Sequence, residues 1–170
     1  GDFNGEWQAT PYFRRSSMTF LQHYPPGQAQ EKNGQTSMGL QTSYQVSPND
    51  NNQIWFGADV EWADMWVEEV QTTALGSPDN VRFQGQHYDF EVESQQIAVF
   101  VNSEWKTSDK LTLEAGLRFE SLRYDYQNNM IDGSTRDDGS LCNSGDGSCR
   151  YYRPSDQTNS TDNLNYQLGA

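Results

Sequence analysis

Residues 111–126 read LTLEAGLRFESLRYDY. The odd positions from Leu111 to Phe119 are leucine, alanine and phenylalanine, whereas the even positions are threonine, glutamate, glycine and arginine. A strict period of two residues predicts a β-strand with one apolar face and one charged face. The alternation runs on longer than an ordinary globular strand of about 5–6 residues. It therefore raises the question of which environment needs such a strand.

The composition favours a β-rich chain. Of the 170 residues, 34% are hydrophobic but 13% are aromatic, which suits strands that have one polar face. No run of about 18 apolar residues is present, so the sequence predicts no transmembrane helix. Strands of a membrane barrel remain compatible, because every second residue in them is polar. The chain opens on GDFNGEW without a recognisable signal peptide, so we expect a mature segment.

The charge of the chain argues against nucleic acid as a partner. Lysine and arginine number 11 against 24 aspartates and glutamates, which gives a formal net charge of -13. A surface of this sign repels phosphate backbones. No catalytic motif is recognisable, since acidic pairs such as Glu68-Glu69 and Asp137-Asp138 are common in loops. We therefore expect neither an enzyme nor a cofactor.

The two cysteines, Cys142 and Cys149, lie in the stretch LCNSGDGSC. We predict a disulfide between them in an oxidising compartment, because a metal pair would need another histidine or cysteine nearby. A catalytic thiol is less supported, since His23 and His87 are the only imidazoles and neither lies in a recognisable motif.

Aspartates around these cysteines raise the question of calcium. Their spacing fits no EF-hand loop, so we expect an acidic loop and no metal site. The aspartates concerned are Asp132, Asp137, Asp138 and Asp146.

Stretches with the pattern of long strands alternate with connections of two lengths. Two connections are tight turns, near 48–52 and 107–109, and three are long, near 22–35, 69–90 and 127–162. Successive connections of an up-and-down meander emerge at opposite edges, so all long connections lie at one edge, as is typical of outer-membrane barrels. We predict an all-β, antiparallel up-and-down meander of about five to six long strands, which forms a single partial segment of a transmembrane β-barrel over residues 1–170. The expected strands are 5–24, 36–47, 53–70, 90–106, 111–126 and 163–170.

Both tight turns predict a register that keeps apolar residues on one face, and a slip of one residue would scramble both faces. For the turn near 48–52 the opposed pairs are Val46–Ile54, Tyr44–Phe56, Thr42–Ala58, Leu40–Val60 and Met38–Trp62. For the turn near 107–109 they are Trp105–Leu111, Val101–Ala115, Val99–Leu117 and Ile97–Phe119. The second register also places Phe100 across from Gly116, where an aromatic ring would cover exposed backbone.

Aromatic residues lie at both ends of the predicted apolar face. Trp7, Tyr44 and Trp105 lie toward the short-turn edge, and Trp62 and Phe119 lie toward the long-loop edge. Aromatic girdles at both rims of an apolar band are typical of membrane barrels. Aromatic residues are, however, enriched in β-strands of all kinds. Each full strand reaches the length of about 9–11 residues that a tilted spanning strand needs.

These stretches carry a resemblance to a known family. The stretch QIAVFVNSEWKTSDKLTLEAGLRFESLRYDYQN (96–128) resembles the mid-barrel signature of TonB-dependent outer-membrane receptors, with its Gly-Leu-Arg segment at Gly116. FGADVEW (56–62) is similar to the "Gly-x-Asp" strand one hairpin earlier. The closing NLNYQLGA (163–170) resembles the "Pro-x-Leu-Gly" strand, with Tyr166 where proline is usual and Gln167 as a second departure.

The resemblance implies a fragment of a receptor for scarce nutrients such as ferric siderophores or cobalamin, in the outer membrane of a Gram-negative bacterium. Receptors of this family have about 22 strands closed by a plug, and no plug domain is recognisable here. The implied partners are outer-membrane lipid, the plug and remaining barrel of the parent chain, and through that chain the TonB energy-coupling complex. Charged residues of the polar face would line the lumen or contact the plug: Asp59, Glu61, Glu114, Arg118 and Glu120.

A cluster in the last long loop is the candidate ligand-binding site. Arg150, Tyr151, Tyr152 and Arg153 combine cations with aromatic rings on an otherwise acidic chain. Such a cluster would contact an anionic iron chelate through charge-assisted hydrogen bonds and stacking. A solvated surface loop is the alternative. The preceding long loop offers a similar but looser set: Arg82, Phe83, His87 and Tyr88.

A soluble, secreted β-sandwich that binds a ligand such as carbohydrate is the alternative function. Trp55, Trp62 and Trp66 would then be the stacking residues. This alternative requires the apolar face to pack on a second sheet of the same chain.

Overall fold

The computed structural model describes residues 5–22, 28–74, 83–141, 149 and 151–170. These residues form one six-stranded sheet with the order β1-β2-β3-β4-β5-β6, and each strand is antiparallel to its neighbours. The predicted all-β meander is therefore confirmed. The strands are β1 Gly5–Leu21, β2 Ala29–Asn49, β3 Asn52–Gln71, β4 Gly85–Ser108, β5 Leu111–Asn128 and β6 Gln157–Gly169.

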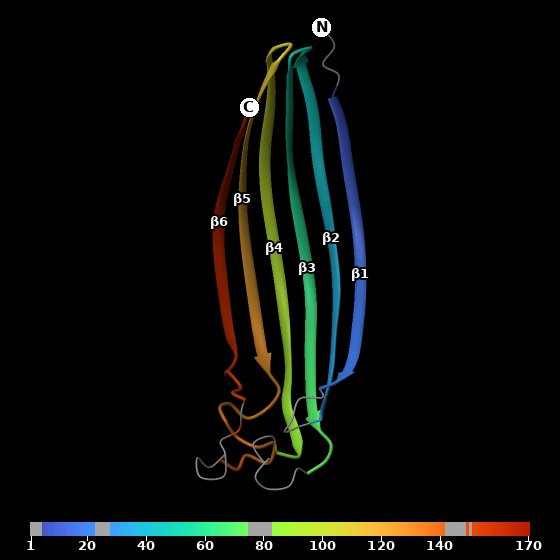
Figure 1. Cartoon of the computed structure of the whole chain (residues 1–170), viewed down its shortest axis with the longest axis vertical. Coiled ribbons are helices and arrows are strands. Elements are labelled where there is room, and N and C mark those ends of the chain that lie inside the picture. The colour runs from blue at the N-terminus through green and yellow to red at the C-terminus, as the bar shows by residue number, and fades with distance from the viewer. Residues whose placement is uncertain (1–4, 23–27, 75–82, 142–148, 150) are drawn as a thin grey trace.

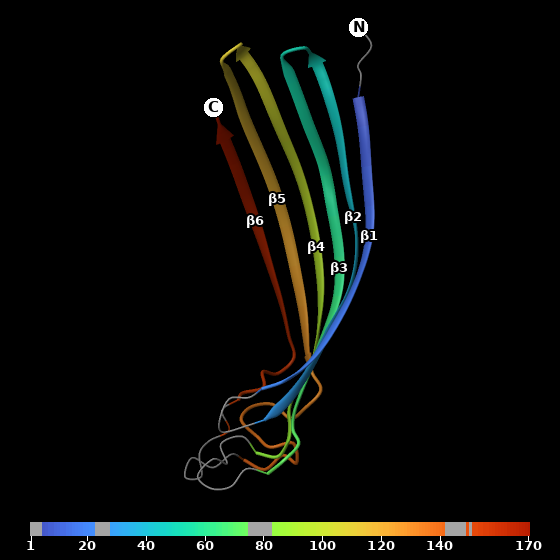
Figure 2. The same cartoon turned by 45° about the vertical axis from the view of Figure 1, so that its right-hand side comes forward.

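The strands lie side by side along the long axis of the molecule, with both tight turns at one end and the long connections at the other (Figure 1). The sheet is curved and twisted along its length (Figure 2). It is also open, because β1 and β6 are its two edges and strands contact only their sequence neighbours. The described residues contain no second sheet of the kind that a sandwich requires. None of them belongs to a helix that is long and apolar enough to cross a membrane.

Three strands begin earlier than the sequence pattern predicted. β2, β4 and β6 start at Ala29, Gly85 and Gln157. The long connections therefore cover 22–28, 72–84 and 129–156, and are shorter than predicted. The additional strand residues are mostly polar and carry no apolar stripe, so their pattern gave no signal. They nevertheless continue the backbone ladders of the neighbouring strands, because each backbone amide and carbonyl needs a partner.

The register of the β2–β3 hairpin is the predicted one. Val46 lies opposite Ile54 and Leu40 opposite Val60, and the other predicted pairs follow in the same register. The turn falls at residues 50–51, where Asn49 Oδ1 accepts a hydrogen bond of 3.0 Å from the backbone N–H of residue 51.

The predicted register of the β4–β5 hairpin is wrong by two residues. Val101 lies opposite Leu117 and not opposite Ala115. A β-bulge between Lys106 and Ser108 extends β4, so the turn moves to residues 109–110. The Thr107 hydroxyl stabilises this bulge by donating to the Leu111 carbonyl at 3.0 Å. Because the slip equals one full period of the strand, each residue keeps its predicted face.

The slip also changes which glycine is covered by Phe100. Phe100 lies opposite Gly57 of β3, and its Cζ lies 2.7 Å from the position that a Cβ on Gly57 would occupy. The predicted partner, Gly116, lies opposite Asn102 instead. Aromatic cover of a strand glycine is therefore present, but on the preceding strand rather than the following one.

Candidate functional site

Large apolar side chains of the strands are exposed on one face of the sheet, which we call the outer face. Without lipid such a continuous surface is unfavourable in water, whereas the hydrocarbon of a bilayer is a suitable solvent for it. These exposed residues form the apolar band: Trp7, Phe13, Met38, Leu40, Phe56, Trp62, Ile97, Val99, Val101, Trp105, Leu111, Leu113, Leu117, Phe119, Leu164, Tyr166 and Leu168.

The apolar band crosses the sheet at an angle to the strands. Its limit on the long-loop side is Trp62 on β3 and Phe119 on β5. Phe119 lies in register with Val99 and hence with Ala58, which precedes Trp62 by four residues, or about 13 Å of strand. The strands are therefore tilted relative to the band, as the strands of membrane barrels are to the bilayer.

Aromatic rings line the rim of the apolar band at the tight-turn end. Trp7, Tyr44 and Phe56 lie in one row across β1, β2 and β3. The ring centroids are 6.4 Å apart for Trp7 and Tyr44 and 5.4 Å apart for Tyr44 and Phe56. Amphipathic rings in this position suit the boundary between hydrocarbon and headgroups.

The opposite face, which we call the inner face, carries ion pairs that link distant strands. Arg118 of β5 donates from Nη1 to Asp59 Oδ2 of β3 at 2.7 Å and lies 3.4 Å from Glu120 Oε2. Between these strands β4 presents Ala98, which is fully buried. A small residue at this position allows the guanidinium to pass over β4 and reach β3.

A second inner-face contact joins β1 to β3. The Tyr12 hydroxyl and Arg14 Nη2 both donate to Glu61 Oε2, the latter at 3.0 Å. The guanidinium of Arg14 also lies 4.8 Å from the centroid of the Tyr12 ring. The inner face is thus polar and internally paired at the level where the outer face is apolar.

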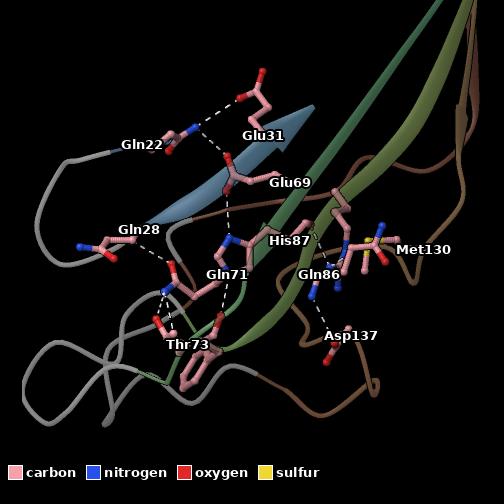
Figure 3. Close-up of polar contacts among 12 residues, drawn as sticks. Gln22, Gln28, Glu31, Glu69, Gln71, Thr73, Gln86, His87, Met130 and Asp137 are labelled. Carbon is pink, nitrogen blue, oxygen red and sulfur yellow. Dashed lines mark hydrogen bonds and ion pairs between the residues drawn. The ribbon is translucent and has the colours of Figure 1, made fainter. Parts of the chain in front are cut away.

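At the long-loop end of the inner face lies a group of buried polar side chains, which we call the loop-edge cluster: Glu69, Gln71, His87, Tyr151 and Arg153. His87 is only 1% exposed. Its Nδ1 lies 2.9 Å from Glu69 Oε1 and its Nε2 lies 2.7 Å from the Phe83 carbonyl (Figure 3). A carbonyl can only accept, so Nε2 donates and a proton lies between Nδ1 and the carboxylate.

Two glutamines tie the first long connection to β3. Gln22 Nε2 donates to Glu69 Oε2 at 2.9 Å and to Glu31 Oε2 at 3.2 Å (Figure 3). Gln71, which is fully buried, accepts from the Gln28 amide at 3.1 Å and donates to the Thr73 carbonyl at 2.9 Å. Both ends of the connection 22–28 are thereby held against the end of β3.

Arg153 holds the last long connection against the start of β4. It is fully buried, and its guanidinium donates to the carbonyls of Ile131 at 2.7 Å, His87 at 3.1 Å and Thr135 at 2.5 Å. The backbone of Arg153 also exchanges two hydrogen bonds with Gly133. Five N–H donors in a fixed fork suit such a collection of carbonyls, which a lysine could not satisfy together.

Tyr151 completes the loop-edge cluster. Its ring stacks on His87 with the centroids 4.7 Å apart and meets Tyr88 edge-on at 5.8 Å. Burial raises the pKa of the Tyr151 phenol above its ordinary value, because the phenolate would lose hydration. All three long connections therefore meet at His87, the first through Gln22 and Glu69, the second through Phe83 and the third through Tyr151 and Arg153.

Comparison with protein families agrees with the two-faced sheet. Residues 13–167 match the family model for an outer membrane beta barrel domain. The chain belongs to the outer membrane β-barrel domain family. Neither a curated protein nor a solved structure matches it at a significant level. The apolar band of this outer-membrane barrel chain is accordingly its lipid-facing surface, and the predicted outer-membrane location is confirmed.

The structure separates the predicted ligand-binding residues of this barrel chain. Tyr151 and Arg153 are buried, and the three donating nitrogens of Arg153 all bind protein atoms. The side chain of Tyr152 is 64% exposed to solvent. Arg150 lies outside the described residues. This geometry gives Arg153 and Tyr151 a role in holding the loops, while Tyr152 keeps the exposure that a ligand contact requires.

The residues predicted as a looser set in the preceding loop are divided between the second connection and the start of β4. His87 is buried, and the guanidinium of Arg136 lies 3.8 Å from the centroid of the Phe83 ring. Arg82 lies outside the described residues. Of the cysteines, Cys149 is buried and disulfide-bonded, whereas Cys142 lies outside the described residues, so the pairing of the two stays a prediction.

Acidic residues of the last connection accept hydrogen bonds from backbone amides, one on β4 and one within the connection. Asp137 Oδ2 accepts from the Gln86 amide at 3.1 Å, and Asp138 Oδ1 accepts from the Ser140 amide at 2.9 Å. The bonds to Ser140 lower the pKa of Asp138 below its ordinary value. No three acidic, histidine or cysteine side chains gather around a possible metal position in the described part of the chain. Asp146 lies outside that part.

Sequence reasoning missed Glu69 and Gln71 as members of the cluster. A signal was present, because both residues continue the inner face of β3 beyond Met65 and Val67. Polar residues that interrupt an apolar run at the end of a strand indicate a buried polar contact.

Proposed function

We propose that this chain is part of the barrel of a TonB-dependent receptor, which takes up a scarce nutrient such as a ferric siderophore or cobalamin. Its strands would form barrel wall, and its long connections would form part of the extracellular mouth. The remaining barrel of the parent chain would continue the sheet from the open edges of β1 and β6, and a plug would fill the lumen against the inner face. The energy-coupling complex would act through the parent chain.

The observation that carries the proposal is the ion pair between Asp59 and Arg118. Asp59 belongs to FGADVEW and Arg118 to the Gly-Leu-Arg segment, the two stretches that resemble the receptor family. The 2.7 Å contact joins them across three strands on the inner face. A charged pair maintained at membrane depth suits a lumen that holds a polar plug or water, and would be out of place against hydrocarbon.

The loop-edge cluster supports the same proposal. The described parts of the three long connections meet in this cluster on the inner side of the sheet, where nutrient would enter. An exposed aromatic side chain of the last connection, Tyr152, is available for stacking on a ligand. We expect Tyr152→Ala to lower ligand affinity directly, whereas Arg153→Ala would act by disordering the loops.

A two-part experiment on the full-length parent protein tests the proposal. The protein is reconstituted into planar bilayers, and uptake of radiolabelled ferric chelates and cobalamin is measured in cells with and without a functional energy-coupling complex. A plugged receptor gives no steady open-channel conductance, and its uptake requires the complex. A large constant conductance, together with uptake that does not depend on the complex, would identify a passive pore and reject the proposal.

A further inference from the structure

The outer face changes character where the apolar band ends. On β3 the residues after Trp62 that share its face are Asp64, Trp66, Glu68 and Val70. Trp66 is thus a single aromatic residue on a polar surface, continuous with the lipid-facing band but outside it. The apolar band ends before this residue, and the loop-edge cluster lies on the opposite face of the sheet.

The indole of Trp66 covers the backbone of the neighbouring strand β2 at a glycine. Its cross-strand partner on β2 is Gly34, and indole atoms Nε1, Cε2 and Cζ2 lie 2.6–2.9 Å from the position that a Cβ on Gly34 would occupy. Any side chain at residue 34 would therefore displace the ring. The indole remains 37% exposed, so its Nε1 side covers the glycine while part of the ring is open to the surroundings.

The surroundings of Trp66 are rich in acceptors. Asp64 and Glu68 flank it on β3, and Glu91 lies opposite it on β4 beside Glu93. All four carboxylates are exposed, and in the described part of the chain none has an ion pair or a hydrogen bond from another side chain. Asp64 and Glu93 lie directly opposite each other, an arrangement of like charges that is unfavourable without a further partner.

The distance of Trp66 from the end of the apolar band restricts which molecule can be the partner of this surface. Four residues separate it from Trp62, about 13 Å along the strand or about 10 Å along the normal of a bilayer when the strand is tilted. The headgroup layer adds only about 5–7 Å to each side of the hydrocarbon. The indole therefore lies beyond the acyl chains, at the level of the saccharide that outer-leaflet glycolipids carry.

We propose that Trp66, with Asp64, Glu68, Glu91 and Glu93 around it, is a docking surface for the saccharide of the outer-leaflet glycolipid. The apolar C–H face of a sugar ring stacks on the open part of the indole, and the carboxylates accept hydrogen bonds from sugar hydroxyls. One cation, Lys32, lies opposite Glu68 on the same face. The four carboxylates outnumber it, so this surface favours neutral sugars over the phosphorylated positions. The proposal requires only the outer-membrane location and stands whether or not the barrel is a TonB-dependent receptor.

The test uses the full-length protein in detergent micelles and the deacylated core oligosaccharide of the outer-membrane glycolipid as probe. Saturation-transfer NMR identifies the sugar protons near the protein, and titration gives the affinity. Trp66→Ala is expected to weaken binding roughly threefold to tenfold, and Trp66→Phe to retain most of it. Gly34→Val leaves Trp66 present but displaces its ring, so it should weaken binding as well. Trp55→Ala is the matched control, since it removes an indole from the inner face of the same strand.

Each alternative outcome is distinct. No binding by the unmodified protein, or an equal loss in the Trp55 control, would overturn the proposal. Binding that requires added calcium and is unchanged in Trp66→Ala would show cation bridging between carboxylates and phosphates, and would overturn it too. Circular dichroism and gel mobility of each variant confirm that the barrel has folded.

Discussion

The two halves of this sheet, one near the tight turns and one near the long loops, place their apolar side chains on opposite faces. In the half that carries the apolar band, leucine, valine and aromatic residues are exposed on the outer face and ion pairs lie on the inner face. In the half near the long loops, the outer face is acidic, and aromatic rings gather on the inner face, as Phe90 does with Tyr88 and Tyr126. One half is arranged for lipid outside and a polar interior, and the other for water outside and a packed interior.

The environment of each segment, and not the strand itself, therefore determines which face is apolar. The change occurs within single uninterrupted strands, such as β3 between Trp62 and Asp64. The backbone ladder continues through the change without a register shift. Substitutions that disrupt one half of the sheet and leave the other intact can therefore test whether the two halves are separate structural units.

The largest effect is expected in the loop half from Arg153→Ala. The free energy of local opening of the last long connection should fall by about 3–5 kcal/mol, because buried carbonyls lose a charged donor. Amide hydrogen exchange of residues 129–141 in the full-length barrel measures this change. Arg15→Ala, which removes an exposed arginine of the outer face, is the control. Exchange that is equally slow in both variants would contradict a holding role for Arg153.

A somewhat smaller loss is expected in the membrane half from Val101→Arg. A cation on the lipid face near the centre of a bilayer costs about 2–4 kcal/mol in membrane barrels. The adjacent substitution Asn102→Arg, on the inner face, should change stability by less than about 1 kcal/mol. Urea unfolding of the full-length barrel from lipid vesicles compares the two. Equal losses would mean that the two faces do not differ in environment.

The inner-face ion pair should contribute less. A double-mutant cycle of Asp59→Asn and Arg118→Gln is expected to give a coupling of about 1 kcal/mol, since both side chains are partly exposed to solvent. The pair Lys106–Asp109 at the β4–β5 turn is almost fully solvated on its acidic side and serves as the control. Its coupling should be about 0.2 kcal/mol or less. A reversed order of the two couplings would contradict the inner-face network.

The smallest effect concerns pH and Tyr151. Its folded pKa is raised above the ordinary value of 10.0 by burial. The free energy with which the buried, protonated Tyr151 stabilises the folded loops is therefore fully present below pH 10.0, where the phenol of the unfolded chain is also protonated. This stabilisation is lost as the pH rises through the folded pKa. Local opening of the last connection should become easier above pH 10.0 in the unmodified protein relative to Tyr151→Phe. Parallel pH profiles for the two proteins would contradict this assignment.

The sequence pattern was sufficient to predict the architecture, because contact with lipid requires a strict alternation of apolar residues along each strand. Every second residue between Leu111 and Phe119 must be apolar, and the same rule sets the faces of β2 and β3. The β4–β5 register escaped the pattern because a slip of two residues leaves both faces unchanged. Only the chemistry of the turn, in which the Thr107 hydroxyl binds the Leu111 carbonyl, distinguishes the two registers.

The candidate site was less accessible to sequence reasoning. Cationic and aromatic residues in a long loop suit a ligand and a loop core equally well, because the same guanidinium binds carboxylates and carbonyls. What separates Arg153 from Tyr152 is burial, and burial depends on how His87, Thr135 and Ile131 come together from distant parts of the chain. No local pattern records such an arrangement.

The meeting of three connections at His87 has a consequence for the immune recognition of a cell that displays this barrel. Residues from positions 22, 69, 83, 87, 151 and 153 belong to one body, so the surface above it is assembled from segments far apart in the chain. Antibodies raised against the folded barrel would recognise a discontinuous epitope. Linear peptides copied from any single loop would lack the neighbours that shape it, and would be poor immunogens for the native surface.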